Sequence, residues 1–574
     1  MAGRFGASSI ARRTVPGIRL IALPWFWWTL AAILAFDLFT AAGQRQAQNY
    51  SDVLRYIHAG WASLTRSMTD CSSLKDPKVT ERPVLYLPED LETPGTVSRL
   101  QATCKVDVER LPVPIHRIGE FDRARLRAGL LYLPNPYVVP GGMFNEMYGW
   151  DSYFIILGLL RDDDLTLARG MVENFFFEIE HYGGVLNANR TYYLTRSQPP
   201  FLTSMVRAIY EAEKASGKAD REWLERAYSY AITDYRFWTT EPHLAGSTGL
   251  SRYYDFGEGP APELGRDADT YYRGAAAYLL LHRSAAADSM LAPEEGHAEA
   301  GLSKGPGYSV LICSQGSGAS AETRGTGCDT VETLHLSADF YKGDRSMRES
   351  GFDVSFRFGP FGGATHHYAA VDLNSLLYKT ETDLGWMSRE LGREQDAADW
   401  AVKARERQSK VDRYCWNESR GLFFDYDFEN GKQSSYEFAT TFYPLWAGLA
   451  SAEQAKAVAR NFRLFDRPGG IDTSTVTSGA QWDDPFGWAP LQLIAVEGLR
   501  RYGDSGDAET VSQQFLSMVA EDFRRDGTIR EKYNVVTRSS EARIGVGYKQ
   551  NVIGFGWTNG VFLELLHELG NQSK

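Results

Sequence analysis

The chain repeats one pattern along most of its length, in which apolar residues recur every three or four positions between loops of glycine, proline and aromatic residues. One segment shows the pattern most clearly, with apolar residues at Leu165, Ala168, Val172, Phe175 and Ile179. An acidic cluster at 162–164 precedes this segment and Gly183 follows it, and such residues start and stop helices. The pattern therefore predicts a helix from Leu165 to near Gly183.

Further segments follow the same helical period. They occupy about 200–216, 221–238, 370–391, 394–413, 440–461, 489–502, 508–525 and 557–569. Alternating strand patterns are scarce, and many helices of similar length in one chain predict a helical toroid or a solenoid. The sequence shows no short repeat, which disfavours the solenoid. In a closed toroid the long loops gather around the axis at one end, and we expect functional residues there.

One stretch breaks the helical pattern. Residues 301–328 are rich in glycine, serine, alanine and threonine, which predicts a long surface loop. A lid over a site and a tolerated insertion remain equally open as interpretations.

The chain has five cysteines, and none of their spacings is that of a zinc ribbon or a redox dithiol. Two disulfides are compatible with the sequence, Cys71 with Cys104 and Cys313 with Cys328, which would leave Cys415 free. The alternative, in which all five are reduced, stays open.

The amino terminus predicts export. Residues 1–20 hold four arginines and no acid, and no charged residue follows between Leu20 and Phe36. Small residues at 40–43 provide a cleavage site, so both a cleaved signal peptide and a retained membrane anchor fit residues 1–42. Either outcome predicts a periplasmic or secreted protein, or one anchored in the inner membrane with its main body outside the cytoplasm.

Composition narrows the ligand classes. With 61 basic and 73 acidic residues the net charge is −12, which argues against general binding of nucleic acid or anionic lipid. Hydrophobic residues make up 43% and charged residues 23% of the chain, as expected for a folded globular protein. The aromatic fraction of 13% suits stacking on carbohydrate, although large cores also hold aromatic residues.

Two stretches carry residue types that bind sugars. In residues 140–154, Trp150 can stack on a pyranose ring while Asp151 accepts hydrogen bonds from hydroxyl groups. In residues 187–200, the guanidinium of Arg196 lies among amides and forms a donor-rich surface for vicinal hydroxyls. Each residue also has a structural interpretation, since a tryptophan in such a position can simply belong to the core.

Two other stretches carry carboxylates in opposed environments. Asp353 is flanked by aromatic residues, which raise the pKa of a carboxyl and favour a group that holds a proton for a leaving group. Glu531 precedes Lys532, and in this cationic setting we expect it to stay ionised. A helix cap and a solvated ion pair are the structural alternatives. A pair of carboxyls with these properties is what glycoside hydrolysis requires.

The chain resembles the trehalases of glycoside hydrolase family 37. The resemblance is carried by residues 140–154, by QWDDPFGWAP at 481–490, and by the runs YLTRSQPP, VDLN and GFGWTNG, and it extends from about Leu133 to Leu566. It implies an all-α (α/α)6 toroid whose long loops form the active site. The expected organisation is a signal or anchor at 1–42, an N-terminal extension at 43–110, and a catalytic domain at 111–574 with a loop insertion at about 266–345.

The resemblance also implies a reaction, the inverting hydrolysis of α,α-trehalose to two glucose molecules without a metal or organic cofactor. Together with the amino terminus and the net charge, the resemblance leads us to expect an exported enzyme of trehalose catabolism with a disaccharide substrate, no nucleic-acid partner, membrane contact only through an anchor, and a monomeric state. Asp353 matches the general acid and Glu531 the general base. The positions that match sugar contacts are Trp150, Asp151, Asn187, Arg196, Ser197, Gln198, Glu263 and Gly351.

Several positions depart from the family pattern. Met143 and Ala261 stand where the family has arginines, Phe352 stands where it has tryptophan, and the glutamate of its G-E-Y run has no clear counterpart in residues 545–550. These changes leave two other hypotheses open. One is an enzyme for a different α-glucoside or a modified trehalose, and the other is a non-hydrolytic, membrane-tethered sugar-binding protein.

Overall fold

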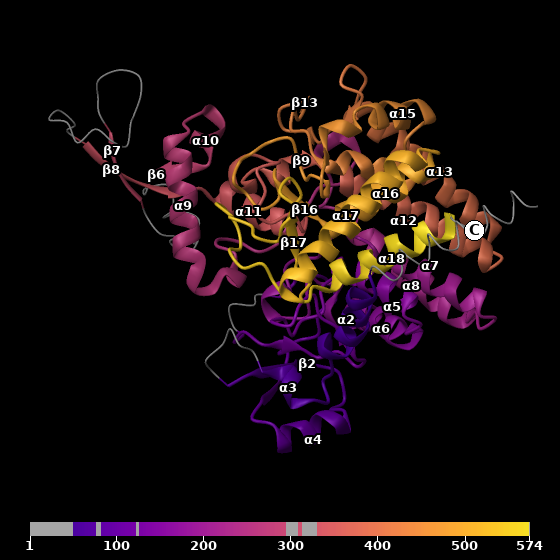
Figure 1. The fold of residues 1–574 in the computed structure, drawn as a ribbon. Helices are drawn as coiled ribbons and strands as arrows, with labels where there is room; N and C mark the ends of the chain where they lie inside the picture. Colours follow the sequence, from indigo (N-terminus) through magenta and orange to yellow (C-terminus); the bar gives the residue numbers. More distant parts are fainter. Residues whose placement is uncertain (1–49, 76–81, 122–125, 294–307, 313–329, 573–574) are drawn as a thin grey trace, which may run out of the picture. The chain divides into compact units, whose positions relative to one another are not determined.

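A computed structural model describes residues 50–75, 82–121, 126–293, 308–312 and 330–572 (Figure 1). The contacts divide the chain into a large unit, residues 52–569, and a small unit made of 1–51 and 570–574. The architecture below is that of the large unit. The signal or anchor expected at 1–42 lies outside the described residues.

The large unit is an (α/α)6 toroid, as expected. Its inner helices are α5 (Asp151–Arg161), α7 (Leu202–Ala215), α12 (Val371–Glu390), α14 (Tyr443–Ala447), α16 (Ala489–Arg501) and α18 (Gly556–Gln572). Its outer helices are α6 (Leu165–Tyr182), α8 (Arg221–Trp238), α13 (Glu394–Cys415), α15 (Ala452–Arg460), α17 (Ser505–Asp526) and α2 (Ser51–Leu64). Consecutive inner helices from α5 through α7, α12 and α14 to α16 pack against one another (Figure 1).

Helix α18 closes the inner ring between α16 and α5. Arg161 on α5 forms an ion pair of 2.6 Å with Glu564, and Arg500 on α16 pairs with Glu568. The backbones of α5 and α18 approach so closely that a Cβ added to Gly158 would lie 2.6 Å from the Cα of Gly560. Only glycine permits this contact, because it has no side chain. The closure of the ring therefore depends on glycine at position 158.

The pattern of buried residues explains which helices are inner and which are outer. Helix α12 buries residues on all its faces, as expected for a helix surrounded by other helices. Helix α13 buries only a stripe at helical spacing, made of Ala397, Trp400, Ala404, Arg407, Val411 and Cys415. A single apolar stripe is typical of a helix with one face in solvent.

The predicted helix boundaries agree closely with the structure. Helix α6 begins after Asp164, whose carboxylate accepts a hydrogen bond from the Leu167 N–H at 3.1 Å, and ends at Gly183 with φ 84°. The segment predicted as one helix over 440–461 is instead two, because Gly448 adopts φ 77° and ends α14. Ser451 and Gln454 then start α15 with a capping box.

Part of the expected N-terminal extension belongs to the toroid. Helix α2 packs on the ring, since the Trp61 indole donates a 2.7 Å hydrogen bond to Asp162 and the Tyr56 ring contacts Phe523 at 5.2 Å between centroids. The predicted boundary at residue 110 thus places one outer helix outside the catalytic domain. The apolar stripe Val53, Ile57, Trp61 and Leu64 is the reason α2 docks there.

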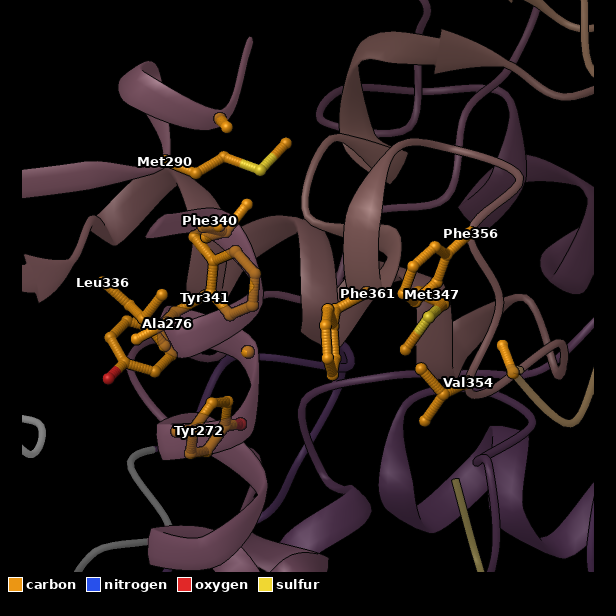
Figure 2. Packing of buried hydrophobic residues seen from close by; sticks show 14 residues of the cluster. Tyr272, Ala276, Met290, Leu336, Phe340, Tyr341, Met347, Val354, Phe356 and Phe361 are labelled. Atoms are coloured by element: carbon orange, nitrogen blue, oxygen red, sulfur yellow. The ribbon is translucent and has the colours of Figure 1, made fainter. Parts of the chain in front are cut away.

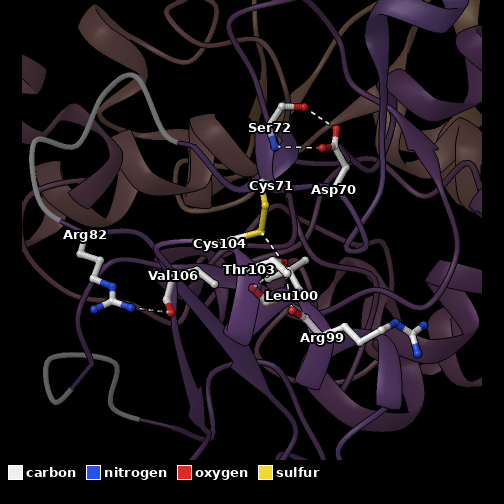
Figure 3. Close-up of a disulfide and its surroundings, with 9 residues drawn as sticks. All are labelled: Asp70, Cys71, Ser72, Arg82, Arg99, Leu100, Thr103, Cys104 and Val106. Carbon is white, nitrogen blue, oxygen red and sulfur yellow. Dashed lines mark hydrogen bonds between the residues drawn. A yellow bond between two sulfur atoms is a disulfide. The ribbon is translucent and has the colours of Figure 1, made fainter.

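Two strands of this region belong to a small parallel sheet. Strand β2 (Val84–Leu87) lies between β3 (Asp107–Arg110) and β4 (Leu130–Leu131), and α4 (Gly95–Thr103) connects β2 to β3. A disulfide joins Cys71 to Cys104 beside α4 (Figure 3). Cys415 is free and buried, and Cys313 and Cys328 lie outside the described residues.

The insertion expected at about 266–345 contains regular structure. It holds α9 (Ala268–Leu281), α10 (Ala285–Ser289) and an antiparallel sheet of order β6-β8-β7, formed by Leu291–Pro293, Thr330–Leu336 and Tyr308–Ile312. Tyr272, Met290 and Leu336 of this region pack with Phe340 of α11 (Ala338–Glu349) and with Phe361 (Figure 2). This core anchors the insertion to the segment that leads into Asp353.

Candidate active site

Asp353 follows the carboxyl end of α11. Its side chain is 23% exposed, and its Oδ2 lies 3.8 Å from Nη1 of Arg348. The Tyr548 hydroxyl donates a 2.8 Å hydrogen bond to the same Oδ2. Burial raises the pKa of Asp353 to about 6, although the charge of Arg348 and the Tyr548 hydrogen bond oppose the shift. This carboxyl can therefore carry a proton in weakly acidic solution.

The two stretches that carry the sequence motifs meet at the backbone of Asp353. The Trp482 indole donates a 3.1 Å hydrogen bond to the Asp353 carbonyl oxygen, and the Gln481 side-chain amide donates to the same oxygen. Trp482 also contacts Trp150, with ring centroids 6.0 Å apart. Residues far apart in the sequence thus fix the Asp353 segment jointly.

Glu531 lies directly before β17 (Lys532–Asn534), which pairs with β16 (Phe486–Trp488). Its side chain is 13% exposed and forms a 2.8 Å ion pair with Nζ of Lys532. The same Nζ lies 3.2 Å from Oε1 of Gln481. Gln481 therefore links the two candidate catalytic segments, since its amide nitrogen contacts Asp353 and its oxygen contacts the partner of Glu531.

Asp151 is the third carboxyl of this site. It is the first residue of α5 and is 4% exposed. Burial raises the pKa of Asp151 well above its usual range, and the charges of Glu531 and Asp353 raise it further. The effect of both charges on this buried group places Glu531 and Asp353 each in the neighbourhood of Asp151.

Two arginines lie beside Glu263. Arg196 contacts Glu263 at 2.6 Å, and Arg348 lies 3.7 Å from the same oxygen. Burial acts to raise the pKa of Glu263, but the charges of Arg196 and Arg348 outweigh it and lower the pKa to about 2. The charges of Arg196 and Glu263 also act on Asp353, so the two residues belong to the same site.

The other expected sugar contacts are held by the framework of the site. The Asn187 amide donates to the Ser197 carbonyl at 3.4 Å, the Ser197 hydroxyl donates to the Val185 carbonyl at 2.6 Å, and Gln198 Oε1 accepts from the Trp150 N–H at 3.0 Å. These bonds order the loop at residues 187–198. Contact of these side chains with a sugar stays a prediction.

Trp150 packs against Gly351, two residues before Asp353. It is 1% exposed, and a Cβ on Gly351, which has φ 76°, would come within 2.9 Å of its ring. Glycine is needed here both for the left-handed backbone and for the close approach. In this arrangement Trp150 supports the Asp353 segment by packing, and its stacking on a pyranose stays a prediction.

Four contributors to the site were not identified from the sequence, namely Arg348, Gln481, Lys532 and Tyr548. Arg348 carries a weak signal, since it lies five residues before Asp353 on the helix that leads to it. The other residues lie more than a hundred positions from Asp353 along the chain, and no local periodicity relates such distant positions.

The altered recognition positions differ in their surroundings. Met143 is half-buried, whereas Ala261 is 1% exposed and its N–H donates a 2.6 Å hydrogen bond to the Tyr272 hydroxyl. Arg345 donates to the carbonyl of the preceding Pro260 at 3.2 Å. The space around Ala261 is therefore already occupied, partly by a cation.

Several known proteins resemble this chain over most of its length. A family model described as Trehalase matches residues 42–278 and 326–570. The cytosolic neutral trehalase of Saccharomyces cerevisiae is 34% identical over 573 residues, which cover 88% of this chain and 69% of the yeast protein. That of Neurospora crassa is 34% identical over 570 residues, covering 88% and 71%. The solved structure of neutral trehalase Nth1 from S. cerevisiae superposes with a TM-score of 0.70 at 33% identity and covers 91% of this chain and 93% of that one.

These comparisons correct one expectation and bear on another. The relatives are named cytosolic, which contradicts the predicted export to a periplasm or the medium and the predicted anchoring in a membrane. Among the described helices, none is long and apolar enough to cross a membrane. The uncharged run at 20–36 suggested export because a signal peptide has the same composition. The relatives are also named trehalases, which are enzymes, so the hypothesis of a non-hydrolytic sugar-binding protein finds no support.

Proposed function

The chain belongs to the trehalase family of glycoside hydrolases, and from this premise we propose that it hydrolyses α,α-trehalose to two glucose molecules with inversion at one anomeric carbon. The observation that carries the proposal is the grouping of Asp353 and Glu531 around Asp151 in different electrostatic environments. One carboxyl has a pKa raised to about 6, and the other is paired with an ammonium group. Inverting glycosidases use such a pair as acid and base.

Asp353 is the proposed general acid. In its protonated form it donates a proton to the glycosidic oxygen as the bond to the anomeric carbon lengthens. Tyr548 donates to Oδ2, so Oδ2 acts as an acceptor and the acidic proton belongs on Oδ1. The tyrosine thereby selects the oxygen that delivers the proton.

Glu531 is the proposed general base. Its carboxylate removes a proton from a water molecule that attacks the anomeric carbon from the face opposite the leaving group. The oxygen of water joins this carbon with inverted configuration, and the second glucose leaves with the proton from Asp353. This geometry requires a carboxyl separation of roughly 6.5–9.5 Å, which leaves room for the water.

The remaining polar groups are proposed to bind hydroxyls. Arg196 offers a guanidinium whose charge is already balanced by Glu263 and Asp255, so it can donate to a neutral sugar without leaving an uncompensated charge. Asp151, with its raised pKa, can donate as well as accept. A site of balanced charge suits an uncharged disaccharide.

A different α-glucoside or a modified trehalose is the second candidate substrate. The observation that favours it is the apolar, half-buried Met143 at a position where the family has an arginine. Loss of one charge-assisted hydrogen bond weakens binding by about 1.5–3 kcal/mol. A substrate with an apolar or bulky group at this point would not require that bond.

The test is glucose release from trehalose by the purified full-length chain and by the variants Asp353→Asn and Glu531→Gln, with Asp90→Asn and Glu92→Gln as matched surface controls. We expect both active-site variants to lose about 10²–10⁴-fold in kcat while the controls keep their activity.

The configuration of the product is a second measurement. NMR of fresh product is expected to show one α- and one β-glucose. Product of retained configuration would refute inversion. An inactive wild type that is folded and active on another glucoside would favour the second candidate.

A further inference from the structure

Asp339, His366 and His367 form a compact cluster at the amino-terminal end of α11. Asp353 follows the opposite, carboxyl-terminal end of the same helix. Asp339 lies in the first turn of α11, and the two histidines end the short helix η7 (Thr365–His367). Oδ1 of Asp339 lies 2.9 Å from Nε2 of His366 and 3.2 Å from Nε2 of His367. The three atoms all lie within 4.8 Å of one another.

We propose that this cluster binds a divalent transition-metal ion, with Zn²⁺ as the best fit. In a tetrahedral zinc site with metal–nitrogen and metal–oxygen distances of about 2.0–2.2 Å, neighbouring ligand atoms lie roughly 3.3–3.5 Å apart. The observed distances of 2.9 and 3.2 Å are only slightly shorter. To hold the ion, Oδ1 of Asp339 must therefore move away from each of the two histidine nitrogens by less than about 0.6 Å.

The ligand set selects the class of ion. Imidazole nitrogens suit zinc, cobalt and nickel, whereas calcium and magnesium prefer sites made of oxygen atoms. The His366 side chain is 7% exposed, His367 27% and Asp339 45%, so the cluster is anchored in the protein and open to solvent on the Asp339 side. An ion can enter from this side, and water can complete its coordination.

The surroundings of the cluster favour a cation. Asp427 and Glu429 lie close enough to His367 to interact with it electrostatically. One guanidinium opposes them, that of Arg252, whose Nη1 donates a 2.9 Å hydrogen bond to the His366 carbonyl oxygen and whose charge acts on the His366 ring. The cluster is thus surrounded by three carboxylates, those of Asp339, Asp427 and Glu429, and by one guanidinium. Both imidazoles contact the same oxygen of Asp339, and one divalent ion can bind this oxygen and both rings.

The position of the cluster indicates what a bound ion would do. It would fasten η7 to the start of α11, about 15 Å along the helix from the end that leads to Asp353. The ion would stabilise this part of the fold, because it binds the folded chain and has no preformed site in the unfolded one. It would not touch the substrate.

The first test is a calorimetric titration of chelator-treated, full-length chain without an affinity tag with Zn²⁺, repeated with Co²⁺ and followed by visible absorption. We expect one equivalent of saturable binding and cobalt ligand-field bands. The variants His367→Asn and Asp339→Asn are expected to weaken binding at least about tenfold. His116→Asn, a change of an exposed histidine elsewhere, serves as the control and should leave binding unchanged.

A second measurement keeps the test decisive if a variant misfolds. In wild-type protein, Zn²⁺ should protect His366 and His367 from diethyl pyrocarbonate, with the sites read by peptide mapping, while His116 stays reactive. Zinc should also raise the temperature of thermal unfolding in wild type but not in folded His367→Asn. Absence of saturable binding, or binding of full affinity in both ligand variants, would overturn the proposal.

Discussion

The Tyr548 hydroxyl donates a 2.8 Å hydrogen bond to Oδ2 of Asp353, and the same hydroxyl oxygen accepts a 2.9 Å hydrogen bond from Nη1 of Arg348. Arg348, Tyr548 and Asp353 thus form a directed chain of hydrogen bonds that ends on the proposed acid. Tyr548 lies in the loop where the family glutamate has no clear counterpart. A phenol can hold the carboxyl in place without adding a second negative charge beside it.

The wild-type pH profile is expected to report the state of Asp353. A general acid must be protonated in the free enzyme, and the pKa of Asp353 is about 6. We therefore expect kcat/KM for trehalose to fall about tenfold per pH unit above pH 6. Initial rates of glucose release between pH 4 and 9 measure this limb. A profile that stays flat through pH 8 would contradict Asp353 as the acid.

Replacement of Tyr548 by phenylalanine is expected to move this limb to higher pH. The hydrogen bond from Tyr548 favours the ionised form of Asp353 and lowers its pKa, so its removal raises the pKa. We also expect kcat to fall roughly tenfold, because the carboxyl loses its orientation.

Tyr230→Phe is the matched control, since the Tyr230 hydroxyl likewise donates to a carboxylate, that of Glu180, at 3.0 Å on the surface. It should leave the profile unchanged. A shift of the limb to lower pH in Tyr548→Phe would show that the hydroxyl does not act on Asp353 in this way.

Removal of the cation beside Glu531 is expected to affect both activity and stability. Lys532 is fully buried, pairs with Glu531 at 2.8 Å and lies 4.9 Å from the centroid of the Trp488 ring. In Lys532→Met the carboxylate loses its buried partner, which costs about 3 kcal/mol of unfolding free energy. Urea unfolding and kcat on trehalose measure the two effects.

For Lys532→Met we expect kcat to fall by about 10² or more, since the proposed base is no longer held. Lys432→Met, on an exposed strand position, should change neither quantity. Full activity in Lys532→Met would contradict the assignment of Glu531 as the general base.

Positions 143 and 261 lack the arginines of the family, and we expect the two positions to respond differently when arginine is introduced. Met143 is half-buried, and Met143→Arg should fold and lower the KM for trehalose by roughly tenfold if trehalose is the substrate. Ala261 is 1% exposed in a region that already holds Arg345. Ala261→Arg is therefore expected to destabilise the fold by about 3 kcal/mol or more.

Steady-state kinetics of Met143→Arg and urea unfolding of Ala261→Arg measure these effects, with Met143→Leu and Ala261→Ser as size-matched or conservative controls. An unchanged KM for trehalose together with tighter binding of another glucoside would favour the alternative substrate. A stable Ala261→Arg protein would show that the region can open.

The sequence alone predicted most of the helices, the family and the two candidate catalytic carboxyls. Helical periods and the signals that end helices are local. Helix α6 begins after Asp164 because its carboxylate accepts a hydrogen bond from a free N–H group, and it ends at Gly183 because glycine adopts a left-handed backbone. Long motifs such as QWDDPFGWAP identify the family without any knowledge of contacts. The raised pKa of Asp353 also followed from its aromatic neighbours in the chain.

Only the tertiary structure decided how distant segments combine. The membership of α2 in the ring, the break at Gly448, and the sheet and helices of the insertion depend on which surfaces pack together. The same holds for Tyr548 on Asp353, for Gln481 between the two candidate catalytic segments, and for Asp339 with His366 and His367. A hydrogen bond between residues two hundred positions apart leaves no periodic signal, because the fold as a whole, and not the local chain, brings its partners together.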